Sequence, residues 1–474
     1  MKVSRRIVLG ALAASALPLG GCNQIISQLT NERDFTLLEG KEELDPAFHL
    51  LNRAAYGPSP GDLKAVRALG ESAWLARQLD PQSIDDRKCD LRARRFETLY
   101  ADPGLCREFK RSSLRSDLVK HTLLRAVYSK RQLYEVMVGF WSDHFNISLE
   151  KGDCIYLKAQ DDQMIRKHAF GKFPDLLRAS ALSPAMLVYL DGCENKKTKA
   201  SDIPNENYAR ELLELHTMGV DGGYTQKDVQ EAARCLTGFT VKKGRPGHIF
   251  DPNKHDDGAK VVLGEMIAAG GGASDLDKLL AIVSKHPATA RHISKKMISH
   301  FVSEDIKQNH QLQNKLAGVF STTGGDTVSM LDCLFKSSEF ARSKGAKLKR
   351  PFHYVASSLR ALCADTHARP ELTDYLIKMG HAPFQYPTPD GYPDESSAWL
   401  STLLWRWNFA FALCHDKLPD VSTVAKPFKL DNLAPVFATL VGRLPTKEEL
   451  SALREGRESD WLALILASPA FQRC

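Results

Sequence analysis

The sequence lacks the short motifs that identify several common kinds of site. No two of its ten cysteines stand in Cys-x-x-Cys spacing, which argues against a zinc knuckle and a dithiol redox site. No His-Glu-x-x-His pair is present, so the helix motif of zinc proteases is absent. The glycine-rich stretch 219–225 has neither the spacing of a phosphate loop nor a strand before it. Function must therefore be sought in polar residues without a standard signature.

Long apolar runs are also scarce, and the clearest one lies at the N-terminus. Ile7–Leu19 is interrupted only by small residues and Pro18, follows Lys2, Arg5 and Arg6, and leads into Gly20-Gly21-Cys22. This order is typical of an export signal that ends in a lipoprotein cleavage site. The alternative, a membrane helix, needs about 20 apolar residues, and this run is shorter. We therefore predict an export signal over 1–22, with Cys22 lipidated.

The signal also predicts a location. Arg5-Arg6 followed by Ile7-Val8-Leu9 resembles the twin-arginine signal, whose route carries proteins that folded in the cytoplasm. Asn23 follows Cys22, whereas Asp at that position favours inner-membrane retention in the Gram-negative lipoproteins that this N-terminus resembles. We expect a protein that faces the periplasm, anchored through Cys22, with the outer membrane favoured.

The composition of the mature chain is that of an ordinary globular protein. Its 453 residues exceed the roughly 250–300 at which single cores stop growing, which predicts one large helical domain with subdomains, or two domains. The net charge of +7 falls to +4 without the signal, so nucleic acid is not an expected partner. The basic cluster 342–350 is expected to be a solvated loop. Nine cysteines remain, and folding in a reducing compartment predicts mostly free thiols.

Helical spacing dominates the rest of the chain. Residues 23–44 are predicted to be a tether, and residues 45–474 a helical body in which 113–145 is one long amphipathic helix. The glycine-rich insert 238–272 is the only β element expected, as one small hairpin. The predicted class is therefore mainly α: a large multi-helix domain with one small Gly-rich β-hairpin insert.

The strongest group of polar residues lies in the predicted helix 204–218. One face of this helix, about 140° wide, gathers three carboxylates, a guanidinium and an amide: Glu206, Asn207, Arg210, Glu211 and Glu214. Such a face could hold a hard cation through oxygen atoms or supply an acid and a base. The alternative is a solvated face of ordinary i,i+4 ion pairs.

Three other segments carry candidate chemistry. Asp143-His144, which follows two aromatic residues, could be a base with its orienting carboxylate or the end of a helix that favours an imidazole. His255-Asp256 in the insert could ligate a metal ion or form a turn. The loop 387–394 is rich in proline and aromatic residues, and it is expected to be a packed loop or a pocket wall.

Together these segments resemble the domain-of-unknown-function 1800 family of bacterial exported proteins. The matching ranges are 49–62, 140–146, 205–229, 286–302, 379–393 and 406–410. The resemblance implies a large helical domain and no particular activity. It also implies a candidate exported partner from the domain-of-unknown-function 1501 family, which looks like sulfatases and alkaline phosphatases.

The leading hypothesis is an envelope lipoprotein with a polar site between helices, where residues 143–146 meet residues 205–214. His144, Asp143, Glu211 and Arg210 are its candidate catalytic residues, with Glu211 or His144 as the base. A divalent cation, the one cofactor considered, has as candidate ligands Glu206, Glu211, Glu214, His255 and Asp256. The substrate would be an envelope polymer or a small molecule. The rival is a non-enzymatic, membrane-anchored scaffold, which predicts an exposed apolar patch. A third reading is a polymer-binding module that uses tryptophans at 141, 399, 405 and 407.

Overall fold

The computed structural model describes residues 21–30, 35–199, 201–424 and 432–474. Residues 1–20 of the predicted export signal 1–22, and the side chain of Cys22, lie outside the described part of the chain. Within that part, the search for an apolar helix of membrane-spanning length found no candidate.

Helices dominate the described chain, as the sequence predicts. In the first half they are α1 (Gly21–Thr30), α2 (Pro46–Ala54), α3 (Pro60–Leu69), α4 (Glu71–Leu79), α5 (Arg87–Ala93), α6 (Pro103–Cys106), α7 (Arg111–Tyr128), α8 (Gln132–His144), α9 (Cys154–His168), α10 (Phe173–Ala181), α11 (Pro184–Tyr189), α12 (Asn207–Glu214) and α13 (Gln226–Cys235).

The second half is equally helical. Its helices are α14 (Ser274–Lys285), α15 (Pro287–Phe301), α16 (His310–Thr323), α17 (Thr327–Phe335), α18 (Ser338–Arg342), α19 (Pro351–Ala361), α20 (Pro370–Lys378), the 3₁₀ helix η5 (Ser396–Thr402), α21 (Leu403–Cys414), α22 (Leu433–Val441), α23 (Lys447–Glu455), α24 (Trp461–Ala467) and α25 (Pro469–Gln472).

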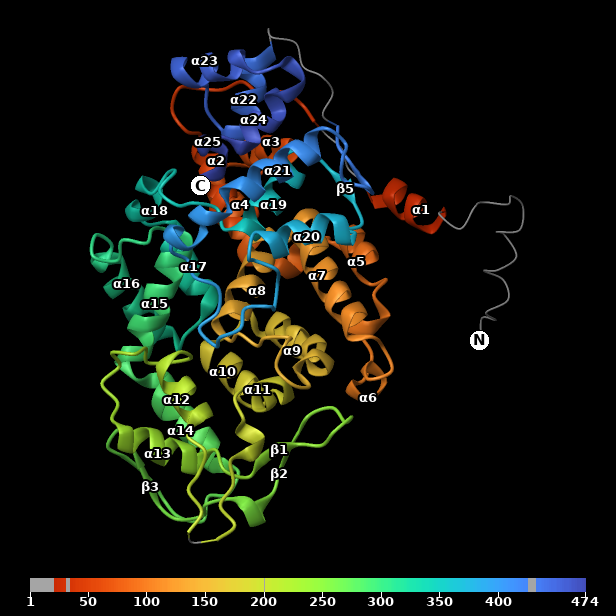
Figure 1. The fold of residues 1–474 in the computed structure, drawn as a ribbon. Coiled ribbons are helices and arrows are strands. Elements are labelled where there is room, and N and C mark those ends of the chain that lie inside the picture. Colours follow the sequence, from red (N-terminus) through yellow and green to blue (C-terminus); the bar gives the residue numbers. More distant parts are fainter. Residues whose placement is uncertain (1–20, 31–34, 200, 425–431) are drawn as a thin grey trace, which may run out of the picture.

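The two ends of the body pack together. Helices α2 and α3 lie among the last helices of the chain (Figure 1). The segment predicted as a tether takes part in this contact, because Leu38 N donates to Thr439 Oγ1 over 2.9 Å and Leu444 N to Lys41 O over 2.7 Å. Residues 35–44 are therefore packed on the body. One cluster of buried apolar side chains extends from Ala47 to Phe471, so the body has a single core.

The predicted long helix at 113–145 is two helices, α7 and α8. The break is stabilised by Asp86, whose carboxylate accepts from Lys130 N and Ser129 Oγ, each over 2.7 Å. The Gln132 amide closes the end of α7 by donating to Ala126 O and Ser129 O. Because Asp86 comes from another part of the chain, helical spacing alone could not reveal the break.

The glycine-rich insert contains two antiparallel hairpins where one was predicted. Strand β1 (Phe239–Val241) pairs with β2 (His248–Phe250), and β3 (Lys260–Val262) pairs with β4 (Glu265–Ile267). A third two-stranded ladder joins β5 (Asp365–Thr366) to β6 (Val421–Ser422). The class is mainly α, as predicted.

Two further sequence expectations concern polar groups. No disulfide joins the described cysteines, in agreement with the preference for thiols. The expectation of a solvated basic loop at 342–350 is wrong for its second half, since Lys347 and Lys349 are 4% and 1% exposed. Lys349 Nζ donates to Ser357 Oγ over 2.9 Å and lies over the Phe471 ring. Contacts from elsewhere in the chain thus enclose these lysines.

Candidate active site

Helix α8 separates a polar cavity from the apolar core. Glu135, Gly139, Ser142 and Asp143 recur at three- and four-residue steps and line the cavity. The opposite face buries Met137, Phe140, Trp141 and His144. Neighbouring residues such as Asp143 and His144 therefore lie in different environments.

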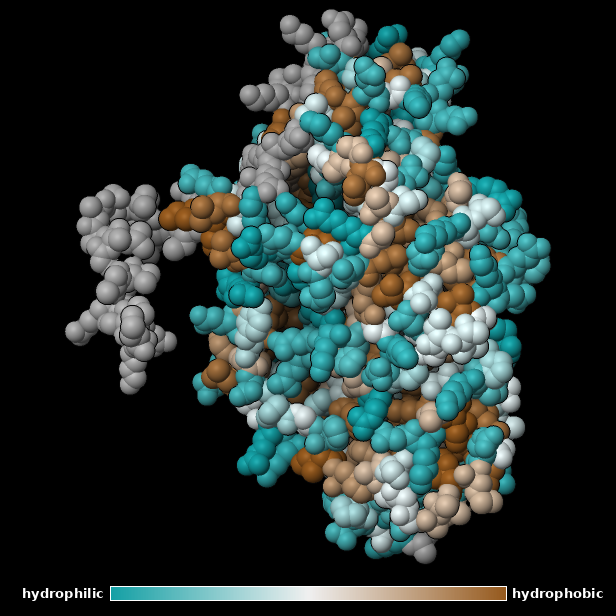
Figure 2. Space-filling model, turned by 180° about the vertical axis from the view of Figure 1, so that it is seen from behind, coloured by the Kyte–Doolittle hydropathy of each residue, from teal (hydrophilic) through white to brown (hydrophobic). Residues whose placement is uncertain are grey.

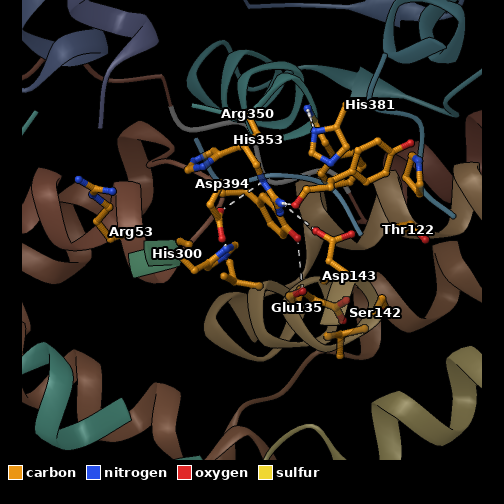
Figure 3. Close-up of a pocket in the computed structure, with 18 of the residues that line it drawn as sticks. Arg53, Thr122, Glu135, Ser142, Asp143, His300, Arg350, His353, His381 and Asp394 are labelled. Atoms are coloured by element: carbon orange, nitrogen blue, oxygen red, sulfur yellow. Dashed lines mark hydrogen bonds and ion pairs between the residues drawn. The ribbon is translucent and has the colours of Figure 1, made fainter. Parts of the chain in front are cut away.

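The cavity has a volume of about 90 Å³. This is several times the roughly 10–15 Å³ that a cavity needs to hold one water molecule. Its other walls come from α2 and Tyr56, from α7 and α9, from the end of α15, from residues 347–353 and from the loop 381–394. Figure 3 shows His300, Asp394, Arg350 and Asp143 gathered in this cavity.

A chain of charged side chains crosses the cavity. The Arg350 guanidinium forms an ion pair with Asp143 (Nη1 to Oδ2, 2.8 Å) and lies 3.9 Å from Asp394. His300 Nδ1 is 3.1 Å from Asp394 Oδ1. Burial lowers the pKa of Arg350, but Asp143 and Asp394 outweigh it and raise that pKa. The guanidinium therefore stays charged.

The Asp394 carboxylate fixes the tautomer of His300. Burial would raise the pKa of Asp394, but His300, Arg350 and Lys347 together lower it, so the carboxylate is ionised and can only accept. His300 Nδ1 must then carry the proton. Burial also lowers the pKa of His300, outweighing the Asp394 charge. At neutral pH, His300 is therefore a neutral imidazole whose Nε2 holds a lone pair.

His300 Nε2 has no hydrogen-bond partner among the described residues. The ring packs edge-on against Phe140 and Phe301, at centroid distances of 5.3 and 4.8 Å. This apolar contact fixes the ring plane while Nδ1 stays with Asp394. A neutral imidazole held in this way is arranged as a general base.

Several other buried polar atoms at the cavity lack partners in the described structure. They are Asn52 Oδ1, Arg53 Nε and Nη1, Ser142 Oγ, Asp162 Oδ1 and His353 Nε2. Buried polar groups are nearly always hydrogen-bonded. A concentration of unpaired donors and acceptors in one cavity therefore indicates a place where water molecules or polar groups of a ligand bind.

The proline-rich loop 387–394 is a wall of this cavity, which is one of the two roles predicted for it from the sequence. Asn146 Nδ2 holds it to the end of α8 by donating to Tyr386 O (3.1 Å) and Thr388 O (2.7 Å). Gly391 has a φ of 76°, and a Cβ there would lie 2.1 Å from Asp143 O. The loop backbone can therefore approach α8 this closely only because residue 391 is glycine. This close approach places Asp394 beside His300.

The predicted Asp143–His144 dyad is not formed. Asp143 pairs with Arg350 in the cavity, whereas His144 is 1% exposed and donates from Nε2 to His216 O over 3.1 Å. Burial lowers the pKa of His144 well below its usual value. His144 thus contacts His216, two residues beyond the predicted segment 205–214, within the core.

The polar face of α12 lies partly at the surface. Arg210 forms an ion pair with Glu206 (3.1 Å) and a hydrogen bond with Gln226, in agreement with the ion-pair alternative. Burial, with the nearby Glu214 charge, raises the pKa of Glu211. Glu206, Arg210, Glu211 and Glu214 are not among the residues that line the cavity.

The five predicted metal ligands do not converge. Asp256 forms an ion pair with Arg234 at 2.8 Å, and His255 Nδ1 lies 2.9 Å from Thr237 O. Glu206 is engaged by Arg210 as described above. Among the described residues, no group of three or more His, Cys, Asp or Glu side chains has the arrangement of a metal site.

Sequence reasoning did not select His300, Arg350 and Asp394 as site residues. They come from the end of α15, from the residue before Pro351 and from the end of the proline-rich loop, so no local spacing connects them. The sequence held one weak indication of them. Of the segments that resemble the family, 286–302 contains His300 and 379–393 ends next to Asp394.

Comparison with known proteins agrees with the fold described above. The model of the family described as "Protein of unknown function (DUF1800)" matches residues 49–473. The chain therefore belongs to this family, as its motifs predict. Neither the search of curated proteins nor that of solved structures gave a match.

Proposed function

We propose that this protein is an exported, lipid-anchored enzyme that uses His300 as a general base on a small polar substrate. The observation that carries the proposal is the His300–Asp394 pair at the polar cavity. The other imidazole nitrogen, His300 Nε2, makes no hydrogen bond with the described residues. A base poised in this way contributes about 10²- to 10⁴-fold to a reaction that removes a proton. The family membership supplies no activity, so the argument rests on the site.

The size and charge of the cavity limit the substrate. A volume of about 90 Å³ is below the roughly 300–1,000 Å³ of pockets for drug-sized ligands. Four cationic side chains and four carboxylates line its described walls: Arg53, Arg166, Lys347, Arg350, Glu135, Asp143, Asp162 and Asp394. Because these charges balance, the cavity favours a substrate without net charge. A small molecule, or the end group of an envelope polymer, meets both limits.

Each cavity residue has a distinct place in the proposed reaction. His300 Nε2 would take a proton from a hydroxyl group or a water molecule, and Asp394 would stabilise the imidazolium that forms. Arg350, held by Asp143, keeps Asp394 ionised and so maintains the tautomer of His300. Ser142 and Asn52 offer unpaired atoms to which substrate hydroxyls can bond.

The test compares His300→Gln and Asp394→Asn with the wild type on extracts of the cell envelope, followed by mass spectrometry. His310→Gln is the matched control, because His310 is exposed on α16. We expect the wild type and the control to consume a component that the two site variants leave intact. Equal consumption by His300→Gln and the wild type would contradict the proposal.

A second candidate function is favoured by one observation on the surface. Leu400, Leu404 and Trp407 are 56%, 68% and 44% exposed and follow one another at helical spacing on η5 and α21. Such a face suits the rival role of a membrane-anchored scaffold for an exported partner of the domain-of-unknown-function 1501 family. Stoichiometric co-purification of a partner, lost in Leu404→Asp, would support it. The polymer-binding reading is weaker, since Trp141 and Trp399 are 1% and 4% exposed.

A further inference from the structure

Helix α1 begins next to the predicted lipidation site and is attached to the body. Arg92 Nε donates to Thr30 Oγ1 over 2.5 Å, and Ser27 Oγ lies 3.5 Å from His367 Nε2. At a rise of 1.5 Å per residue, Cys22 is only about 12 Å from Thr30. A lipid on Cys22 would therefore hold this flank of the body close to a bilayer.

The exposed side of α1 carries two apolar side chains, together with Gln28. Ile25 and Leu29 are one helical turn apart and are 43% and 62% exposed. Figure 2 shows this hydrophobic surface on α1, which projects at the left edge of that view beside the grey residues. Two exposed apolar side chains next to the lipidation site are suited to the boundary between headgroups and acyl chains.

The neighbouring helix α5 combines one apolar side chain with basic ones. Arg87, Lys88, Leu91 and Arg94 are exposed and recur on one face of the helix, and Leu91 is 47% exposed. Asp85 pairs with Arg87 at 2.7 Å and offsets part of the charge. Helix α5 packs against α1, and its buried face supplies Arg92, which binds Thr30.

We propose that α1 and α5 form a membrane-binding face for a bilayer that contains acidic phospholipid headgroups. Ile25, Leu29 and Leu91 enter the headgroup region, and Arg87, Lys88 and Arg94 contact the acidic headgroups. The face adds a second attachment to the acyl chain on Cys22. This inference rests on one part of the proposed function: the protein is exported and lipid-anchored. The anchor is what brings α1 to the membrane.

Basic side chains beside exposed apolar ones form a membrane-binding signal of their own, additional to lipidation. The α1–α5 face supplies that signal within the folded protein. It also fixes the orientation of the body, because α5 lies on one flank of the helical body (Figure 1).

The test measures binding of the folded chain to vesicles without its lipid. Cys22→Ser protein is mixed with vesicles of phosphatidylcholine, with or without phosphatidylglycerol, and sedimented at low salt. We expect binding to the vesicles that contain phosphatidylglycerol. Neutralising Arg87, Lys88 and Arg94 to Gln should weaken this binding on the order of 100-fold, at about tenfold or less per basic residue. Leu29→Asp should weaken it about tenfold.

Matched controls lie on the hairpin insert, away from α1 (Figure 1). Lys242, Lys243 and Arg245 are three exposed basic residues between β1 and β2, and Met266 on β4 is 76% exposed. Replacing the three basic residues by Gln, or Met266 by Asp, should leave vesicle binding unchanged. Each variant is first compared with Cys22→Ser by thermal unfolding, so that misfolded protein is not scored.

The outcomes separate the membrane face from lipid anchoring. If Cys22→Ser protein binds no vesicles, or if α1–α5 and hairpin variants lose binding equally, the membrane face is refuted. Anchoring is tested separately, by comparing wild type and Cys22→Ser in membrane fractions of cells and by mass spectrometry of the N-terminus. An unacylated wild-type chain refutes the anchoring, whatever the vesicles show.

Discussion

The two sides of helix α8 place their histidines in different surroundings. On the core side, His144 and His292 bond through Nε2 to the backbone carbonyls of His216 and Leu215. On the cavity side, His300 bonds through Nδ1 to the Asp394 carboxylate. Burial lowers the pKa of all three. A lowered pKa therefore does not by itself identify a functional histidine, and the carboxylate partner and the cavity are what distinguish His300.

The largest expected effect is on activity and belongs to the cavity side. His300→Gln removes the base and should lower kcat/KM by about 10²- to 10⁴-fold, with little loss of stability. His144→Gln should lower stability through the lost contact with His216 O and leave the chemical step intact. Kinetics and thermal unfolding of both variants check this contrast. A similar activity loss in both would show that the two sides of α8 are not functionally distinct.

A large effect on stability is expected when the ion pair in the cavity is broken. Asp143→Ala leaves the Arg350 guanidinium without its closest counter-charge and should cost about 3–5 kcal/mol in free energy of unfolding. The surface pair on α12 gives the comparison, because Arg210→Gln should cost less than about 1 kcal/mol. Denaturant titration measures both. Equal costs would mean that the Asp143–Arg350 pair is effectively solvated.

The close contact between the loop and α8 predicts a further loss. Gly391→Ala places a Cβ 2.1 Å from Asp143 O and forces alanine into a left-handed conformation. It should therefore destabilise the protein by about 3 kcal/mol and displace Asp394. Gly324→Ala is the control, because Gly324 also has a positive φ but nothing within 4 Å of the added atom. Its cost should be about 1 kcal/mol. If Gly391→Ala loses no more stability than Gly324→Ala, the loop is free to shift.

The smallest expected effect is on the pH dependence of stability, and it comes from His216 on the core side of α8. Burial lowers the pKa of His216 to about 3, so the unfolded chain binds this proton more readily than the folded one. Stability should fall as the pH drops below about 6.5, by up to about 1.4 kcal/mol per pH unit. His216→Phe removes two unpartnered ring nitrogens and should flatten that slope. Unfolding curves between neutral and mildly acid pH test it, and an unchanged slope would exclude His216 as a source.

The local part of the fold could be predicted from the sequence, and the site could not. Helical spacing predicted the mainly α class, and β1–β4 all lie within the glycine-rich insert 238–272, where the sequence predicted a hairpin. Asp143 was selected for its neighbour His144, yet its partner is Arg350, more than two hundred residues away. The α7–α8 break depends on Asp86 and the His300 tautomer on Asp394. Each of these features needs two distant segments in contact, which periodicity does not encode.

The most direct test of the account is the protonation state of His300, read by nitrogen NMR of the labelled imidazoles, with His300→Gln used for assignment. We expect a neutral ring at pH 7 with its proton on Nδ1, a pKa below the usual value of about 6.5, and a change of tautomer population in Asp394→Asn. A ring that is charged at pH 7, or one that carries its proton on Nε2, would contradict the assignment of His300 as the base.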